Sequence, residues 1–260
     1  MKRRHWLKNI IGGAAGLAAL VGGTNAHAQQ RPLDRLRQNE RPQNDRRQNR
    51  RQRSDLAKYD NARFYNADGS FNEEAAKEAY AELFRFHNYT LANVVNDERF
   101  WVLDFGLGDF ANVGMGGIFW VNDKEHGYFG HEIYLLPFQM IPEHAHFEAE
   151  GKSAKHEYWQ VRNGSIYNFG EGGDKNDELP VELPKSQLDA NAITAFQWTE
   201  LTATAGPGGE AVLNRLGAYH FMMGGPEGTI VTEYASYHSG DGLRFQNPNA
   251  FAGNTPAREG

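Results

Sequence analysis

Hydrophobic and polar residues follow two different periods along this chain, and the change falls near Phe100. Between residues 70 and 95 the apolar positions recur three or four residues apart, which is the spacing of one helical face. Ser70 and Glu73 stand at the spacing of a capping box at the start of this segment. We therefore predict a helix whose apolar face consists of Ala76, Ala79, Tyr80, Leu83 and Phe86.

After Phe100 the pattern changes to short apolar or alternating runs separated by glycine, asparagine and aspartate. The runs occupy residues 100–108, 116–122, 127–141, 156–170, 192–203, 216–225 and 228–240. Runs of this kind at a spacing of roughly ten residues are typical of strands in a β-sandwich or barrel. The predicted fold class is all-β, with the helix as an N-terminal extension.

The first 57 residues differ from the rest in composition. Residues 1–28 combine a basic start, an apolar stretch and a small-x-small end, which is the pattern of a cleaved export signal. The pair Arg3–Arg4 resembles a twin-arginine signal, so we expect a periplasmic or exported protein without a membrane span. Residues 29–57 are rich in Arg, Gln and Asn and are predicted to be a disordered linker. The globular domain is then expected at 58–260.

The net charge of −6 conceals two oppositely charged parts. Residues 1–55 hold 13 Lys and Arg against 4 Asp and Glu, which leaves 14 against 29 in the remainder. An acidic domain argues against nucleic acid as its partner. The basic linker is interpreted as a solvated spacer, with contact to anionic envelope surfaces as the alternative.

The chain has no cysteine, so a bound metal must be held by His, Asp, Glu or water. His144 and His146 are one residue apart, and on a β-strand such residues share a face. With Glu157 and a third imidazole from His220 on a later strand, they form a set typical of first-row divalent ions: Mn, Fe, Co, Ni or Zn.

The same parity places Lys155, Glu157 and Trp159 on one face of the strand that follows. If the residues around Gly151 form a connecting loop, this strand can pair with the strand of the two histidines. Pairing of that kind would bring Glu157 against the pair His144 and His146.

These residues also carry a resemblance to known families. The pattern H-x-H…E-x6-G, ending at Gly164 and followed by a later histidine, resembles the motifs of the cupin barrel. Glu150 lies closer to His146, at the spacing usual in cupins, and is the alternative ligand to Glu157. We favour Glu157 because Glu150 runs directly into a loop-like Gly-Lys-Ser segment.

A narrower resemblance, to the D-lyxose isomerase family of sugar isomerases, covers roughly residues 101–248. It rests on VLDFGLGDF, PFQMIPEHAH, the Lys155-x-Glu157 pair and PEGTIVTEYASYHSGDGLRFQNP. The resemblance implies a cupin double-stranded β-helix, or jelly-roll barrel. It also implies a Mn²⁺ site of His144, His146, Glu157 and His220, with Lys155 and Glu233 beside the sugar.

The chemistry of the residues fits aldose–ketose isomerisation, which moves a proton between adjacent carbons through an enediolate. Glu233 is the expected base, and Lys155 is expected to polarise sugar oxygens or return a proton. Trp159 offers a flat wall for the sugar, and Asp241 and Arg244 are candidates to close the pocket. The remaining histidines of this region are assigned structural or exposed positions: His126, His131, His156 and His238.

Two other functions fit parts of this pattern. An Fe(II)-dependent cupin dioxygenase would use the same metal ligands, and a non-catalytic sugar-binding or metal-binding cupin of the cell envelope would need no base. A homodimer is expected by analogy with other cupins.

Overall fold

The computed structural model describes residues 59–171, 182–188, 197–203, 209–213 and 215–252. The predicted signal at 1–28 and the predicted linker at 29–57 lie outside the described residues. The elements are, in chain order, α2 (Asn61–Phe64), α3 (Glu73–Phe86), η2 (Ala92–Asn96), β1 (Phe100–Leu103), β2 (Met115–Asp123), β3 (Tyr128–Leu135), β4 (His144–His146), β5 (Glu157–Gly170), α4 (Lys185–Leu188), β6 (Gln197–Thr202), β7 (Glu210–Val212), β8 (His220–Ser236), η3 (Gly240–Gly242) and β9 (Leu243–Phe245).

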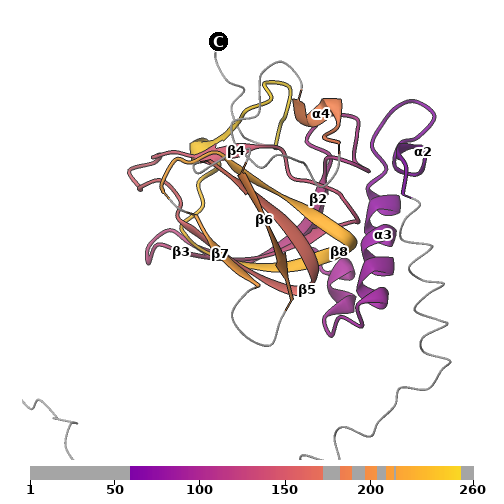
Figure 1. The fold of residues 1–260 in the computed structure, drawn as a ribbon, viewed down its shortest axis with the longest axis horizontal. Coiled ribbons are helices and arrows are strands. Elements are labelled where there is room, and N and C mark those ends of the chain that lie inside the picture. Colours follow the sequence, from indigo (N-terminus) through magenta and orange to yellow (C-terminus); the bar gives the residue numbers. More distant parts are fainter. Residues whose placement is uncertain (1–58, 172–181, 189–196, 204–208, 214, 253–260) are drawn as a thin grey trace, which may run out of the picture. The chain divides into compact units, whose positions relative to one another are not determined.

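The strands of the described part form one antiparallel sheet that curls around a common interior (Figure 1). The order is β1-β2-β3-β8-β4-β9, and β5 joins through β8 and also pairs with β6 and β7. The long strand β8 is central, because it pairs with β3, β4 and β5. The predicted all-β class with an N-terminal helix is therefore confirmed.

The long strands β5 and β8 run side by side and bend together at a pair of glycines. Gly164 has φ +71° and Gly228 has φ +65°, a region that favours glycine. A Cβ atom on Gly164 would lie 2.0 Å from the carbonyl oxygen of Gly228. The glycine of the E-x6-G pattern is thus required by a close approach of two backbones.

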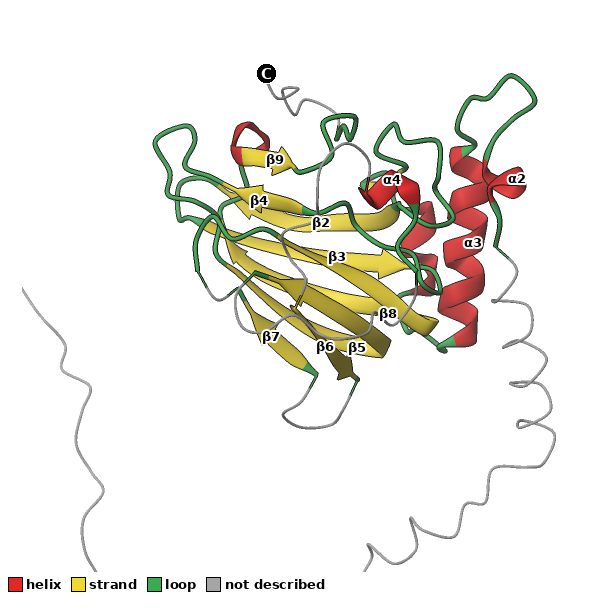
Figure 2. Cartoon of the chain, turned by 45° about the horizontal axis from the view of Figure 1, so that its top comes forward, coloured by secondary structure: helices red, strands yellow, loops and turns green. Residues whose placement is uncertain are grey.

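Two apolar clusters hold the fold together, one inside the curled sheet and one between its outer face and α3. On β3, Ile133 belongs to the inner cluster and its neighbour Tyr134 to the outer one. On β8, Val231 and Ile230 divide in the same way. Successive strand residues point to opposite faces, so a helix laid on the outside buries both faces. Figure 2 shows α3 outside the strands.

Helix α3 begins two residues later than the capping-box spacing indicates. Its N-cap is Asn72, whose side chain accepts a hydrogen bond from the backbone N–H of Ala75 at 3.1 Å. The expectation that Ser70 caps the helix was wrong, because Ser70 directly follows the preceding turn and its hydroxyl donates to Asp68. Phe84, rather than the half-buried Phe86, completes the apolar face. The buried residues are Ala76, Ala79, Tyr80, Leu83 and Phe84.

The strand pattern also differs in one respect from the sequence expectation. The last two apolar runs, at 216–225 and 228–240, belong largely to one continuous strand, β8. The glycines between them bend the strand instead of ending it, because its neighbour β5 bends at the same level. None of the helices in the described part has the length and hydrophobicity needed to span a bilayer.

Candidate functional site

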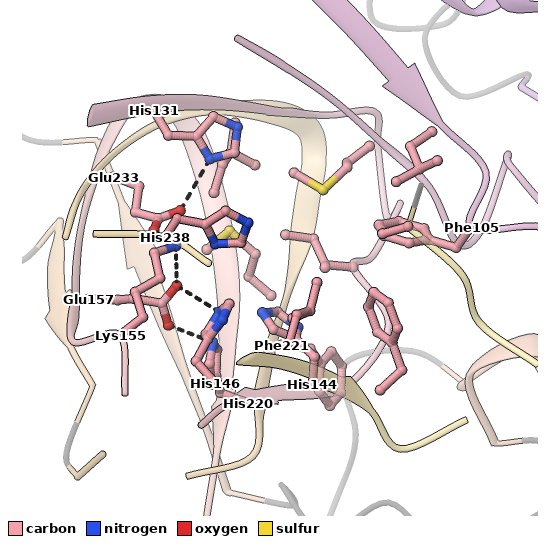
Figure 3. A pocket seen from close by; sticks show the side chains of 18 of the residues that line it. Phe105, His131, His144, His146, Lys155, Glu157, His220, Phe221, Glu233 and His238 are labelled. Atoms are coloured by element: carbon pink, nitrogen blue, oxygen red, sulfur yellow. Dashed lines mark hydrogen bonds and ion pairs between the residues drawn. The ribbon is translucent and has the colours of Figure 1, made fainter. Parts of the chain in front are cut away.

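Three histidines and one glutamate meet inside the curled sheet (Figure 3). His144 and His146 come from β4, and Glu157 and His220 are the first residues of β5 and β8. One possible ligand atom from each residue lies within 4.8 Å of the others. His146 Nε2 is 3.2 Å from Glu157 Oε1, and His220 Nε2 is 2.9 Å from Glu157 Oε2. The structure thus brings together the four residues that the sequence indicates as metal ligands.

Glu157 reaches the histidines by a route that the sequence did not predict. Strand β4 pairs with β8 and β9, with His144 opposite His220, while β5 pairs with β6, β7 and β8. The expected direct pairing of the strands of His146 and Glu157 was wrong, because β8 pairs with both of them. The side chains meet across the concave face of the sheet.

Backbone carbonyl groups fix the orientation of two imidazole rings. His144 Nδ1 lies 2.8 Å from the carbonyl oxygen of Pro142, and His220 Nδ1 lies 2.9 Å from that of Ala218. A carbonyl oxygen can only accept, so each Nδ1 carries the hydrogen and donates it. Each Nε2 is then left to offer its lone pair to an ion, as a metal-binding imidazole does.

Burial and charge act differently on the three histidines. Burial lowers the pKa of His146, and it lowers the pKa of His144 well below its usual value, with further repulsion from the neighbouring imidazoles. Burial also opposes a charge on His220, but the Glu157 carboxylate outweighs it and raises the pKa of His220. Two of the three rings are therefore held neutral, the state in which imidazole binds metal.

The site fits a divalent cation by two observations. His146 Nδ1 is buried without a hydrogen-bond partner in the described part of the chain, and His146 Nε2 and Glu157 Oε2 are buried beside other members of the cluster. Buried polar atoms without good partners are costly, and an ion among the four residues would satisfy one ring nitrogen of His146 and the Glu157 carboxylate. The donor set of three imidazoles and one carboxylate suits first-row transition ions, whereas Ca²⁺ and Mg²⁺ prefer more oxygen ligands.

Glu150, the alternative ligand, points elsewhere. It is exposed, forms a salt bridge with Lys124 at 2.8 Å and accepts a hydrogen bond from Ser239 Oγ at 2.8 Å. The segment between β4 and β5 turns there, with positive φ at Glu150 and Gly151. The structure therefore favours Glu157 over Glu150.

Lys155 and Glu233 lie next to the four possible ligands, deep in the protein. Lys155 Nζ donates to Glu157 Oε1 at 2.8 Å and also to Glu233 Oε1. Lys155 is 5% exposed and Glu233 is 3% exposed. Burial alone would lower the pKa of Lys155, but the carboxylates of Glu157 and Glu233 outweigh it and raise that pKa. Lys155 is thus held as a cation between two carboxylates.

His131 was missed by the sequence interpretation as a site residue. Its Nδ1 lies 3.2 Å from Glu233 Oε2, and the two residues are cross-strand neighbours on β3 and β8. The Trp101 ring stacks on the imidazole at a centroid distance of 5.5 Å, and a Cβ on Gly117 would lie 2.5 Å from His131 Nε2. Burial lowers the pKa of His131. Its alternation with Phe129 and Ile133 on β3 was the signal that could have placed it inside.

The other histidines divide between the cavity and the surface. His238 lines the cavity with its ring 5.6 Å from that of His146, and burial lowers its pKa well below the usual value. Assigning His238 only a structural or exposed position therefore missed its place in the cavity. His126 pairs with Asp123 on the surface, and His156 contacts the carbonyl of Leu213.

The residues predicted to bind substrate are distributed unevenly. Trp159 is buried and lines the cavity, with its ring 5.4 Å from that of His220. Asp241 is exposed, and Arg244 donates to the backbone carbonyls of Asp241 and Leu243. Neither Asp241 nor Arg244 is among the residues that line the cavity. Gly240, which directly precedes Asp241, does line it.

All of the buried site residues open onto one cavity of about 390 Å³. This volume lies within the usual range of small-molecule sites, about 300–1,000 Å³. One side of the cavity holds the charged and imidazole groups, and the opposite side is lined by aliphatic and aromatic side chains (Figure 3). The arrangement offers a cation site, a buried carboxylate–lysine pair and an enclosed volume for a small molecule.

Comparison with known proteins bears on the family. No family model matches the chain. The D-lyxose/D-mannose isomerase of Thermosediminibacter oceani is 32% identical to it over 151 residues, which are 58% of this chain and 78% of that protein. The D-lyxose ketol-isomerase of Cohnella laeviribosi is 32% identical over 161 residues, which are 62% and 82% of the two chains.

Among solved structures, the L-ribose isomerase of Cellulomonas parahominis with L-psicose is similar over 73% of this chain and 98% of that chain. The identity is 16% and the TM-score 0.46, which is too low to carry an argument. The sequence relatives do carry one, because each shares 32% of the aligned residues over more than three quarters of its own length. By these matches the chain belongs to the D-lyxose ketol-isomerase family.

Proposed function

We propose that this protein is a metal-dependent aldose–ketose isomerase that interconverts a free sugar such as D-lyxose with its ketose, D-xylulose, by enediol proton transfer. Family membership supports the reaction type. The observation that carries the proposal is that Lys155 and Glu233 line the same buried cavity as the three histidines and Glu157. An isomerase needs both parts in one place, a cation site and a group that moves a proton.

The four clustered residues, His144, His146, Glu157 and His220, would hold one divalent ion. Mn²⁺ is the ion that we propose, and Fe, Co, Ni and Zn suit the same donor set. When bound, the ion supplies a Lewis acid that polarises the sugar carbonyl. The proton transfers are left to the side chains of the chain itself.

Glu233 is the base in this proposal. Its carboxylate takes the proton from C2 of the aldose, and the electron pair of that bond forms the C1–C2 double bond of the enediolate. The resulting carboxylic acid exchanges its hydrogen with solvent and delivers a hydrogen to C1. Each carboxylate oxygen has two acceptor positions, so the contacts with Lys155 Nζ and His131 Nδ1 leave one free on each. These contacts hold the carboxylate in one orientation, which is what a positioned base requires.

Lys155 serves the oxygen atoms of the sugar. Isomerisation also moves a proton from O2 to O1, and a lysine ammonium can donate to the developing oxyanion at O1 and recover a proton from O2. Its burial keeps water away from this exchange and strengthens the interaction of its charge with the enediolate.

The test is proton NMR of the purified, metal-loaded protein in D₂O with D-lyxose and with D-mannose. Ketose signals with deuterium at C1 would support isomerisation through an enediol. Protein that binds metal but converts neither sugar with Mn, Fe, Co, Ni or Zn would contradict the proposal. A dioxygenase or a non-catalytic cupin would then explain the site better.

A matched pair of glutamate variants sharpens this experiment. Glu233→Gln removes the base and is expected to reduce turnover by about 10²–10⁴-fold. The control is Glu132→Gln. Glu132 pairs with Thr232, the position next to Glu233 in the β3–β8 ladder, and its side chain accepts hydrogen bonds from Thr232 and Tyr89. It does not line the cavity. Turnover in that control should stay near the wild-type value.

Localisation, domain boundaries and assembly are part of the same proposal. We propose export by the twin-arginine route, cleavage after residue 28, a linker at 29–57 and a functional domain at 58–260 that acts in the periplasm, with a homodimer as the assembly. N-terminal sequencing of protein from fractionated cells and light scattering of the purified protein test these points. A full-length chain retained in the cytoplasm would contradict the export proposal.

A further inference from the structure

The cavity has two chemically distinct sides. One side carries the possible metal ligands with Lys155, Glu233 and His131. The other side, which we call the apolar lobe, is formed by Phe105, Met115, Ile133, Phe221, Met222 and Phe245. In Figure 3, Phe105 lies across the cavity from Glu233 and His131. Both sides belong to one continuous space of about 390 Å³.

Nearly every polar side chain that lines this space already has a role at the reacting end of the sugar. Apart from the groups assigned above, the described lining residues offer His238 and the indole N–H groups of Trp101 and Trp159 as further polar side chains. The apolar lobe itself is lined by side chains that can neither donate nor accept a hydrogen bond effectively.

This arrangement is the opposite of what a fully hydroxylated sugar requires. An aldose held at C1 and C2 must place its remaining carbons further into the cavity, and each of their hydroxyl groups needs a partner once it leaves water. A hydroxyl that is buried without one loses its hydrogen bonds to water and gains nothing in return. A methyl group at the same place is favoured by contact with the aliphatic and aromatic walls.

From this division we infer that the substrate is a deoxy sugar, an aldose whose far end carries a methyl group in place of a hydroxymethyl group. The inference rests on the proposed isomerase function and narrows its substrate class. The methyl end would occupy the apolar lobe, while C1 and C2 remain beside Glu233 and Lys155.

Pairs of sugars that differ only in the terminal hydroxyl test the inference, because it predicts that the deoxy sugar of each pair is the better substrate. We expect kcat/KM to be about 10- to 100-fold higher for 6-deoxy-D-mannose than for D-mannose, and likewise for 5-deoxy-D-lyxose over D-lyxose. An apolar pocket rejects an added hydroxyl only by factors of this size, so the hydroxylated sugars remain slow substrates. A pocket built to bind the terminal hydroxyl would reverse the order, and that result would overturn the inference.

A binding measurement separates this inference from the proposed function. D-mannitol and 6-deoxy-D-mannitol cannot be isomerised, so calorimetry with the metal-loaded protein reports on the cavity alone. Tighter binding of the deoxy alditol supports the inference even if no aldose is converted and the proposed function fails. Equal or weaker binding of the deoxy alditol contradicts the inference whatever the turnover.

Variants at Met222 place the preference in the apolar lobe. Met222→Gln keeps the length of the side chain and adds an amide to the lobe, and it should reduce the preference for the deoxy sugar by about tenfold. Met222→Leu keeps the lobe apolar and should retain the preference. A preference unchanged in Met222→Gln would argue against the lobe as its origin, and the wild-type comparison still decides the inference if that variant does not fold.

Discussion

Removal of the buried charge of Lys155 is the perturbation whose outcome the structure specifies most directly. Its ammonium group donates to both Glu157 and Glu233 and lies 4.5 Å from the centre of the Phe129 ring. Lys155→Met keeps most of the aliphatic stem and removes only the charge and its hydrogen bonds. The packing contribution should therefore change little.

The expected loss follows from what remains after the substitution. Glu157 and Glu233 are each at most 3% exposed, so two carboxylates would stay buried without the cation that neutralised them. Breaking a buried ion pair by removing one partner costs about 3–5 kcal/mol. This is a large part of the free energy of unfolding of a typical domain, about 5–15 kcal/mol.

Urea denaturation of metal-free wild-type and Lys155→Met protein at pH 7 measures the difference. The pH dependence gives a second check. Although burial opposes it, Lys155, His146 and His220 hold the pKa of Glu157 well below its usual value. Because the folded pKa is depressed, this stabilisation is present above the unfolded pKa of about 4 and is lost as pH falls through the folded pKa. The deficit of the variant should therefore shrink below about pH 4.

A further variant shows whether the carboxylates cause the deficit. Adding Glu233→Gln to Lys155→Met removes one uncompensated charge and should recover part of the lost stability, which a double-mutant cycle quantifies. A deficit below about 1 kcal/mol at pH 7, the level of an exposed ion pair, would refute the buried-charge reasoning. So would a deficit that does not change between pH 7 and pH 3.5.

Three further predictions concern other parts of the site and its support. Gly164→Ala should reduce the free energy of unfolding by about 2–5 kcal/mol, because it adds left-handed strain and a clash with the backbone of Gly228. Gly127 also has a positive φ, +75°, but open space around it, so Gly127→Ala should reduce the free energy of unfolding by only about 1–2 kcal/mol. Equal losses in urea denaturation would contradict the clash. The amide N–H of His131→Asn lies where Nδ1 donates to Glu233, whereas that of His131→Gln does not, so His131→Asn should retain much more of kcat at a similar KM. Equal kcat values in the two variants would argue against a role of His131 in positioning Glu233. Mn²⁺ at 100 times its dissociation constant should stabilise the protein by about 2.7 kcal/mol in thermal melts. Glu157→Gln should weaken this stabilisation, and Glu150→Gln should leave it unchanged. Stabilisation that is lost in Glu150→Gln and kept in Glu157→Gln would favour Glu150 as the ligand.

Local patterns in the sequence were sufficient for several parts of the fold and the site. The three-to-four-residue period predicted α3, and the strand runs predicted the all-β class. Parity alone placed Glu157 and Trp159 on one face of β5, because successive side chains on a strand alternate between faces. Lys155 lies two residues before the strand, and its side chain follows the same alternation and contacts Glu157. The exact start of α3 was not predicted, since two residues near it, Ser70 and Asn72, can each cap a helix.

What the sequence determined by itself was therefore which residues share a face within a single element. Which faces meet was decided by the tertiary structure, through the long strand β8 that pairs with β3, β4 and β5. These pairings set His131 beside Glu233 and left Glu150 at the surface. They also placed the apolar lobe of the cavity opposite the charged groups. The physical reason is that the periodicity of side chains is a property of neighbouring residues, whereas the partners of a strand are chosen by burial of surface from distant parts of the chain.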